Sequence, residues 1–226
     1  MRGILVFVRY PEPGRVKTRL AATVGDDVAA DLYRAFVEDI LKVCDSTSCP
    51  VTVMVSEEKD LQRTQDWLGG LLDGSFVCEA QQGRDLGERM SMAFEWAFGK
   101  GFDRAILIGS DIPDLPAEII PRGFDALSSS DAVIGPSPDG GFYLIGFRSG
   151  GFRPAVFTGL EWSTESVFSE TCGRLAENRL TFEVLPPWDD VDTFDDLQRL
   201  FHRLKTTNGA PRTLISCRRQ VFREEA

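Results

Sequence analysis

Short apolar runs alternate along the chain with longer segments in which apolar residues recur every three or four positions. The short runs are typical of strands buried in a sheet, and the longer segments predict helices with one face against the core. The predicted strands are 4–8, 51–55, 76–80, 105–108, 132–135, 141–147 and 181–185. The predicted helices are 26–43, 60–68, 86–98, 116–127, 165–177 and 193–204.

This alternation predicts an α/β fold with a mostly parallel sheet covered by helices on both faces. Asp139 and Gly140 stand between two apolar runs, which predicts a hairpin and hence an antiparallel contribution to the sheet. A chain of 226 residues, 42% of them hydrophobic, is long enough for one domain with a full core. Because the pattern fades after Lys205, we expect one domain over residues 1–205 and a polar C-terminal tail over 206–226.

Composition narrows the class of protein further. A formal net charge of -10 speaks against binding to nucleic acids or to anionic membranes, and no apolar stretch reaches the roughly 20 residues of a membrane span. Five cysteines without a CxxC pair indicate reduced thiols and a cytoplasmic protein. With a single histidine, His202, sites built on several histidines are excluded, and any metal is expected on oxygen ligands, which suit Mg²⁺ or Mn²⁺.

A basic loop follows the first predicted strand. Arg9, Arg15, Lys17 and Arg19 lie close together with one acid, Glu12, between them. Ligands of parallel α/β sheets bind at the carboxyl ends of strands, so we expect these cations to neutralise a dense anion such as the phosphates of a nucleotide. The loop lacks the glycine that precedes the lysine of a P-loop, so binding would rest on side chains. The alternative is a solvated loop whose ion pairs contribute little.

Aspartates follow two later strands. Asp111 comes three residues after the strand 105–108, and a divalent cation could bind there. Three acids precede the last predicted helix: Asp189, Asp190 and Asp192. A helix start needs fewer acids, and like charges so close together favour a shared cation. This group of acids is therefore a candidate metal partner for Asp111, and ordinary turn and cap roles are the alternative.

Three other segments carry candidate ligand contacts. Gly140 and Gly141 leave bare backbone amides next to Asp139, although the hairpin alone explains all three residues. Arg84 lies between a strand and a helix, where it could reach a ligand. Trp162 precedes a helix and is either an aromatic lid or part of an ordinary helix start.

Five segments, in this order, carry a resemblance to a known family: 11–20, 83–90, 109–115, 139–146 and 190–193. They resemble the selenodomain-associated transferase 1 family of glycosyltransferases, within the nucleotide-diphospho-sugar transferase superfamily. The resemblance covers the chain to about Leu204 and implies the GT-A fold, a single-domain, Rossmann-like three-layer sandwich. It also implies a metal-dependent enzyme that transfers a sugar from a nucleotide-sugar to a small acceptor.

The resemblance implies that Arg15, Lys17 and Arg19 hold the phosphates, that Asp111 and Asp192 bind the metal, and that residues 139–141 face the sugar or acceptor. Together with the candidates taken from the residues themselves, this gives three expected sets. The expected nucleotide-binding residues are Arg9, Gly14, Arg15, Lys17, Thr18, Arg19 and Arg84. The expected substrate-binding residues are Asp139, Gly140, Gly141 and Trp162. The expected catalytic residues are Lys17, Asp111 and Asp139.

Two other functions stay open at this point. A nucleotidyltransferase would join a nucleoside triphosphate to a phosphorylated acceptor and release pyrophosphate, and the dense basic loop suits a triphosphate. A non-catalytic nucleotide-binding module is the third possibility. In all three cases the expected partner is a small nucleotide ligand, with no nucleic acid and no membrane span.

Overall fold

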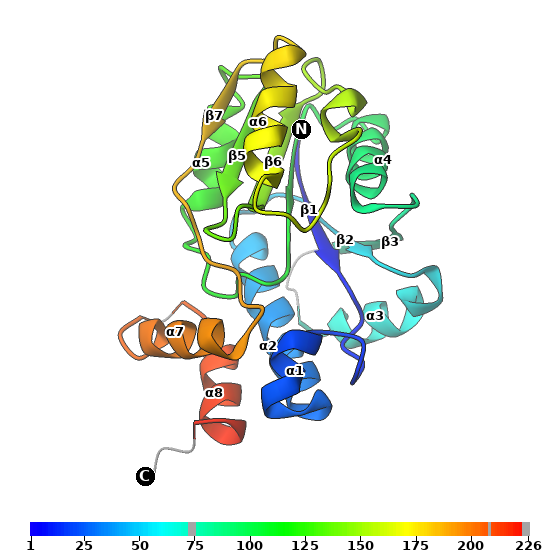
Figure 1. Cartoon of the computed structure of the whole chain (residues 1–226). Helices are drawn as coiled ribbons and strands as arrows, with labels where there is room; N and C mark the ends of the chain where they lie inside the picture. The colour runs from blue at the N-terminus through cyan, green and yellow to red at the C-terminus, as the bar shows by residue number, and fades with distance from the viewer. Residues whose placement is uncertain (72–75, 208, 223–226) are drawn as a thin grey trace.

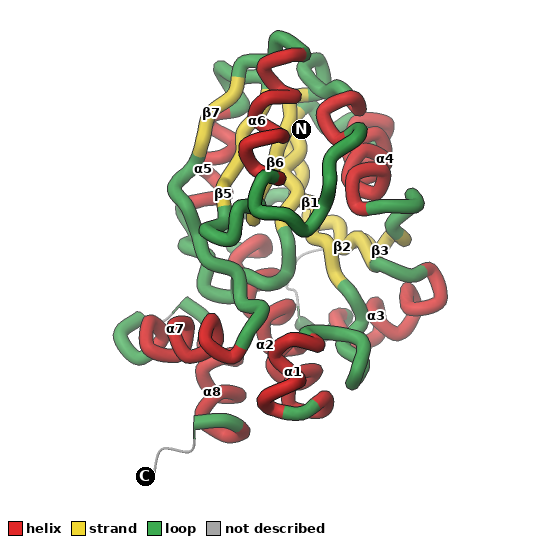
Figure 2. Tube along the Cα trace, in the orientation of Figure 1, coloured by secondary structure: helices red, strands yellow, loops and turns green. Residues whose placement is uncertain are grey.

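The computed structural model describes residues 1–71, 76–207 and 209–222. Within these residues a seven-stranded sheet, in the order β3-β2-β1-β4-β6-β5-β7, forms the centre of the molecule (Figures 1 and 2). The strands are β1 (Arg2–Val8), β2 (Val51–Val55), β3 (Phe76–Ala80), β4 (Arg104–Ile108), β5 (Ala132–Pro136), β6 (Phe142–Arg148) and β7 (Phe182–Val184). Each of these strands overlaps a predicted one, because the apolar runs mark the buried strands directly.

The sheet is mostly parallel, as predicted. β6 is its antiparallel strand and pairs with β4 on one side and with β5 on the other. β5 and β6 form the predicted hairpin, which is closed by a hydrogen bond of 3.0 Å from the Ser137 amide to the Gly141 carbonyl. The insertion of β6 between β4 and β5 places the hairpin turn at the same edge as the carboxyl end of β4.

Helices cover both faces of the sheet and complete a three-layer sandwich. In β1, Ile4, Val6 and Val8 face one layer and Leu5 faces the other, which is the alternation expected of a strand buried on both sides. The first layer contains α1 (Thr18–Val24), α2 (Asp26–Asp45), α3 (Leu61–Leu68), α5 (Ile119–Ala126), α7 (Phe194–Leu204) and α8 (Pro211–Gln220). The second contains α4 (Leu86–Gly99), α6 (Val167–Glu177) and the 3₁₀ turn η2 (Pro154–Phe157), and a further turn, η1 (Glu58–Asp60), precedes α3.

Two helices were not predicted from the sequence. α1 falls in the basic loop and begins after Lys17, which makes no side-chain cap, so no capping signal marks its start. α8 lies in the segment expected to be a polar tail, and it packs against α2 with Thr213 and Cys217 buried. The segment is polar in composition, but its narrow apolar face packs against the rest of the molecule. The expected end of the domain at residue 205 stays a prediction.

Two predicted helices begin two or three residues later than expected. α5 starts at Ile119 and not at Pro116, because the chain before it forms hydrogen-bonded turns. α6 starts at Val167, after a loop that contains Trp162. Among the described helices, none is long and apolar enough to cross a membrane.

Candidate active site

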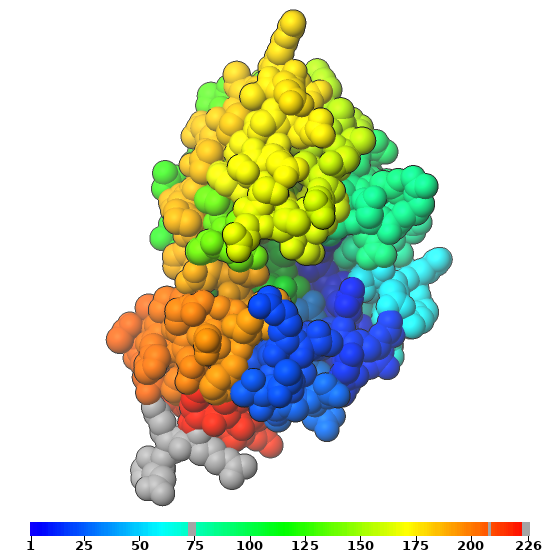
Figure 3. Space-filling view, in the orientation of Figure 1, coloured from blue at the N-terminus to red at the C-terminus, as the bar shows by residue number. Residues whose placement is uncertain are grey.

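A cleft of about 880 Å³ opens at the carboxyl ends of β1, β2, β3 and β4. Figure 3 shows the hollow between the lobe that carries α1 and the lobe that carries α6. The basic loop, the loop after β4, the β5–β6 turn and the loop before α6 all contribute to its walls. Segments far apart in the sequence therefore meet at one place, as the strand-end argument predicted.

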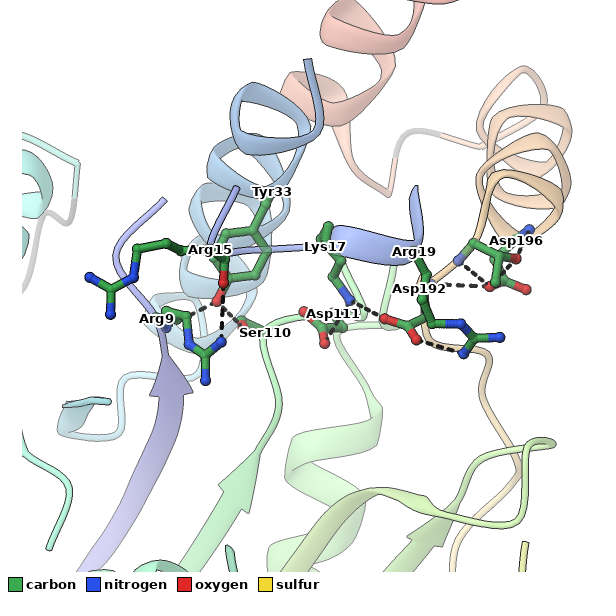
Figure 4. A network of polar contacts seen from close by, with 10 residues as sticks. Arg9, Arg15, Lys17, Arg19, Tyr33, Ser110, Asp111, Asp192 and Asp196 are labelled. Carbon is green, nitrogen blue, oxygen red and sulfur yellow. Dashed lines mark hydrogen bonds and ion pairs between the residues drawn. The ribbon is translucent and has the colours of Figure 1, made fainter. Parts of the chain in front are cut away.

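Lys17 lies at the centre of this meeting point. Its ammonium nitrogen is 2.8 Å from Oδ2 of Asp111 and 3.3 Å from Oδ1 of Asp192, and its side chain is only 4% exposed (Figure 4). Burial by itself lowers the pKa of Lys17, but the two carboxylates more than offset it, so that the pKa is raised. The three residues that the sequence placed in one site are thus in direct contact.

The two aspartates are held together by the backbone as well as by Lys17. The amide of Val191 donates a hydrogen bond of 2.9 Å to the carbonyl of Asp111, which ties the loop before α7 to the end of β4. Directly after Asp192, Thr193 and Asp196 form a capping box that starts α7. The local capping role therefore belongs to Thr193 and Asp196, and Asp192 is left to face the cleft.

A second polar contact joins the loops after β1 and β4. The Tyr33 hydroxyl accepts a hydrogen bond of 3.0 Å from the Arg9 amide and lies 2.8 Å from the Ser110 hydroxyl (Figure 4). Burial, followed by the charge of Asp111, raises the pKa of Tyr33 to about 12. Tyr33 was not among the residues predicted from the sequence, where its one signal is a hydroxyl among the apolar positions of a helix.

The arginines of the basic loop differ in their contacts. Arg19 pairs with Asp192 at 2.9 Å, whereas Arg15 pairs with Glu12 and Glu57. Arg9 donates to the carbonyl of Arg15 and so braces the loop. All three line the cleft beside Lys17.

The remaining predicted nucleotide contacts are only partly gathered at the cleft. Thr18 lines it, but within the described residues Gly14 and Arg84 do not. Arg84 instead pairs with Glu88, and its side chain is 89% exposed. Arg89, in the first turn of α4, lines the cleft and was not singled out from the sequence.

The β5–β6 turn and the loop before α6 form the opposite wall. Asp139, Gly141 and Trp162 line the cleft, and the Gly141 amide donates to the Asp139 carboxylate at 2.9 Å. Gly140 has φ +92° and packs so closely on the backbone of Glu165 that a side chain would overlap it. It therefore shapes this wall from behind and is not among the lining residues described for the cleft.

The other acids near Asp111 and Asp192 have separate surroundings. Asp114 is buried, pairs with Arg203 at 2.9 Å and accepts a hydrogen bond from the Trp188 indole, so its role is structural. Arg203 also pairs with Asp189.

Burial, together with the charge of Asp139, raises the pKa of Asp190 to about 6. Asp190 thus lies within electrostatic reach of Asp139 on the opposite wall.

Two polar residues at the ends of β2 and β3 were also missed from the sequence. The Ser56 hydroxyl is buried and has no hydrogen-bond partner among the described residues, yet Ser56 lines the cleft. Gln81 lines the cleft too, and its amide nitrogen donates to the Met54 carbonyl at 2.7 Å. Their signal in the sequence is their position, because each directly follows a predicted strand.

The sheet order and the cleft define the class of protein. A crystal structure from Desulfovibrio desulfuricans G20, described as a "putative nucleotide-diphospho-sugar transferase", is 43% identical, with 96% of this chain and 94% of that chain covered and a TM-score of 0.89. The fold is accordingly that of the nucleotide-diphospho-sugar transferases, and the protein is assigned to the transferases. This confirms the resemblance seen in the sequence.

A family model described as "Uncharacterized protein conserved in bacteria (DUF2064)" matches residues 40–164. The chain therefore belongs to the DUF2064 family. No curated protein matches the sequence.

More distant structures share the fold. 4-Diphosphocytidyl-2C-methyl-D-erythritolsynthase from Anaerococcus prevotii DSM 20548 is 10% identical, with 91% of this chain and 98% of that chain covered and a TM-score of 0.58. Rv0371c from Mycobacterium tuberculosis H37Rv, solved as a complex with manganese, is 16% identical, with coverage of 88% and 96% and a TM-score of 0.53. At such identities the likeness extends to the fold alone.

Proposed function

We propose that the protein is a metal-dependent transferase that moves a glycosyl group from a nucleotide-activated sugar to a small acceptor. One observation carries the proposal: Lys17, Asp111 and Asp192 come from three distant segments and meet in one cleft. Transfer of a sugar from a nucleotide-sugar needs cationic groups that bind the phosphates. It also needs carboxylates that hold a divalent ion.

The nucleotide would lie along the wall formed by β1, β2 and β3. Its phosphates would contact Lys17 and the arginines of the basic loop, since guanidinium and ammonium groups bind phosphate oxygens strongly. The nucleoside would extend toward Ser56, whose buried hydroxyl lacks a hydrogen-bond partner in the part of the chain that the structure describes. A polar group of the ligand would supply that partner.

Asp111 and Asp192 fit a divalent cation, because their carboxylates already converge on one positive group. Carboxylate oxygens suit Mg²⁺ and Mn²⁺. In the described part of the chain no group of three or more metal-ligating side chains forms, so the other ligands would be phosphate oxygens and water. When bound, such an ion would neutralise the negative charge of the leaving diphosphate.

The acceptor would bind at the opposite wall. Asp139 is held in place by the Gly141 amide and faces the cleft, where its carboxylate would take the proton of an acceptor hydroxyl. Trp162 packs edge-on against Phe142 and would cover a sugar or acceptor with its ring.

We also propose that the protein is cytoplasmic, since its five cysteines are free thiols.

A second candidate is nucleotidyl transfer with release of pyrophosphate. The observation that favours it is the number of cations along the cleft, where Arg89 joins the four of the basic loop. So much positive charge suits a triphosphate better than a diphosphate.

Binding can be tested by thermal unfolding with a panel of nucleotides and nucleotide-sugars, with Mn²⁺ or with EDTA. A ligand at 100 times its dissociation constant adds about 2.7 kcal/mol of stability. We expect stabilisation that needs Mn²⁺, is lost in Asp111→Asn, and is retained in the control Asp195→Asn, which removes an exposed acid on α7. The same stabilisation in EDTA would contradict the metal assignment.

The two chemistries differ in their products. Release of a nucleoside diphosphate from a nucleotide-sugar would support glycosyl transfer, whereas release of pyrophosphate from a nucleoside triphosphate and a sugar phosphate would support nucleotidyl transfer. Nucleotide binding with neither product would indicate a non-catalytic module.

A further inference from the structure

The Lys17 ammonium lies where a cation bound by Asp111 and Asp192 would lie. It is 2.8 Å from one carboxylate and 3.3 Å from the other, and its side chain is 4% exposed, against 38% and 40% for its partners. A divalent ion in contact with both carboxylates would meet the buried ammonium at close range, and like charges a few ångströms apart repel each other. The two cations therefore compete for the same oxygens.

The surrounding backbone is fixed, so that only the Lys17 side chain has to move. The Lys17 carbonyl accepts the amide of Ala21 at 2.7 Å and anchors the first turn of α1. The Val191–Asp111 hydrogen bond joins the backbone segments that carry the two carboxylates, independently of the Lys17 side chain. The long, flexible lysine side chain can leave while the carboxylates stay in place.

Arg19 does not create the same competition. It pairs with the outer oxygen of Asp192 at 2.9 Å, but its side chain is 71% exposed. An exposed ion pair is weak and screened by water. Arg19 is therefore a matched control: a cation of equal charge on the same carboxylate, outside the buried position.

We propose that Lys17 is an internal counter-ion that makes binding of the divalent cation depend on the nucleotide. Without nucleotide, the ammonium neutralises Asp111 and Asp192 and keeps the ion out. Phosphates draw the ammonium toward themselves, and the carboxylates are freed for the ion. This inference rests on the proposed function, and it adds that nucleotide and metal each raise the affinity for the other by the same factor.

The test is the affinity for Mn²⁺ alone, measured by the electron paramagnetic resonance signal of free Mn²⁺ in titrations of the full chain. Lys17→Met is expected to bind Mn²⁺ at least about tenfold more tightly than the wild type, within the usual range of such couplings. Arg19→Met is expected to stay within about threefold of the wild type, because its ion pair is exposed. Lys17→Gln removes the charge but keeps a hydrogen-bond donor, and we expect the same gain in Mn²⁺ affinity. It replaces Lys17→Met in the test if that variant does not fold.

The outcomes separate this inference from the proposed function. A gain in Lys17→Met that disappears when Asp111→Asn is added supports the inference. If neither Lys17 variant binds Mn²⁺ more tightly than the wild type, the inference is wrong, while the proposed function stands on its own Mn²⁺-dependent nucleotide binding. A gain that persists with Asp111→Asn places the metal elsewhere and overturns both.

Discussion

At the scale of single residues, the backbone of Lys17 is as unusual as its side chain. Lys17 has φ 48° and ψ 46°, the left-handed region that glycine enters freely and other residues enter at a cost of about 1–2 kcal/mol. The conformation turns the chain from the basic loop into α1 and leaves the ammonium between two carboxylates. The ion pairs offset a strained backbone at the site, as is common for functional residues.

This strain can be separated from the ion pairs with two variants. Lys17→Gly and Lys17→Ala both remove the ammonium, but only glycine adopts φ 48° without steric cost. We expect Lys17→Gly to be more stable than Lys17→Ala by about 0.5–1 kcal/mol in urea unfolding, once the greater flexibility of unfolded glycine is deducted. An alanine variant as stable as the glycine variant would show that the backbone is not strained.

The residues also show how far the sequence could predict the site. Lys17 and Asp111 were found because charged residues after buried strands meet at one edge of a parallel sheet, whereas the family resemblance singled out Asp192 among its neighbouring acids. Tyr33 was not found, because helix periodicity predicts only that it is buried and says nothing of its contact with Ser110. Arg84 was chosen for its place between a strand and a helix, but it pairs with Glu88, and Arg89 lines the cleft.

At the scale of elements, the β5–β6 turn fixes one wall of the cleft through Gly140. The Phe168 amide donates to the Gly140 carbonyl at 2.8 Å, which ties the turn to the start of α6. Gly140 has φ +92° and its α-carbon lies against the backbone of Glu165. The turn and the loop that carries Trp162 therefore form one packed unit.

Substitution at Gly140 is expected to disrupt that unit. Gly140→Ala adds a methyl group that overlaps the Glu165 backbone in a conformation that alanine avoids, so we expect a loss of about 2 kcal/mol or more in urea unfolding. Gly99→Ala is the control, because nothing lies within 4 Å of its new methyl group and alanine favours a helix. Equal stability of the two variants would contradict the packing described here.

Elements also differ in how clearly the sequence marks them. The ends of β2 and β3 coincide with the predicted ones, because apolar runs bounded by polar residues leave little choice. α1 and α8 were missed because they are short, at 7 and 10 residues, and only a narrow face of each is apolar. Their stability comes from tertiary packing, which periodicity does not report.

At the scale of the whole molecule, the C-terminal segment closes the fold against α2. Asp39 of α2 is buried, and its carboxylate accepts the amides of Arg212 and Thr213 at 3.2 and 2.8 Å. It caps the start of α8 from another helix, since those amides have no partner within α8. Burial raises the pKa of Asp39, although the amides of α8 favour its charged form.

Removal of this cap should loosen the whole layer. We expect Asp39→Ala to cost about 1–3 kcal/mol in urea unfolding, because it leaves two amides without partners and removes a carboxylate from a helix start. Asp31→Ala, at an exposed position of the same helix, should change stability by less than about 0.5 kcal/mol. A cost for Asp39→Ala no larger than that control would show that α8 is not anchored by this contact.

The order of the strands is the whole-molecule feature that the sequence could not supply. The β5–β6 hairpin was predicted, but not its insertion beside β4, which depends on contacts between strands far apart in the chain. That insertion brings Asp139 to the same cleft as Lys17 and Asp111. The topology thus brings the site together, although its main charged residues could be picked out from the sequence.

The proposed function requires that Asp111 and Asp192 hold a divalent cation beside the phosphates of a nucleotide. Crystals grown with Mn²⁺ and a nucleoside diphosphate would test it most directly through the anomalous scattering of manganese. We predict one strong peak in contact with both carboxylates, with the Lys17 ammonium moved onto the phosphates. A manganese peak away from Asp111 and Asp192, with Lys17 still between them, would contradict the account.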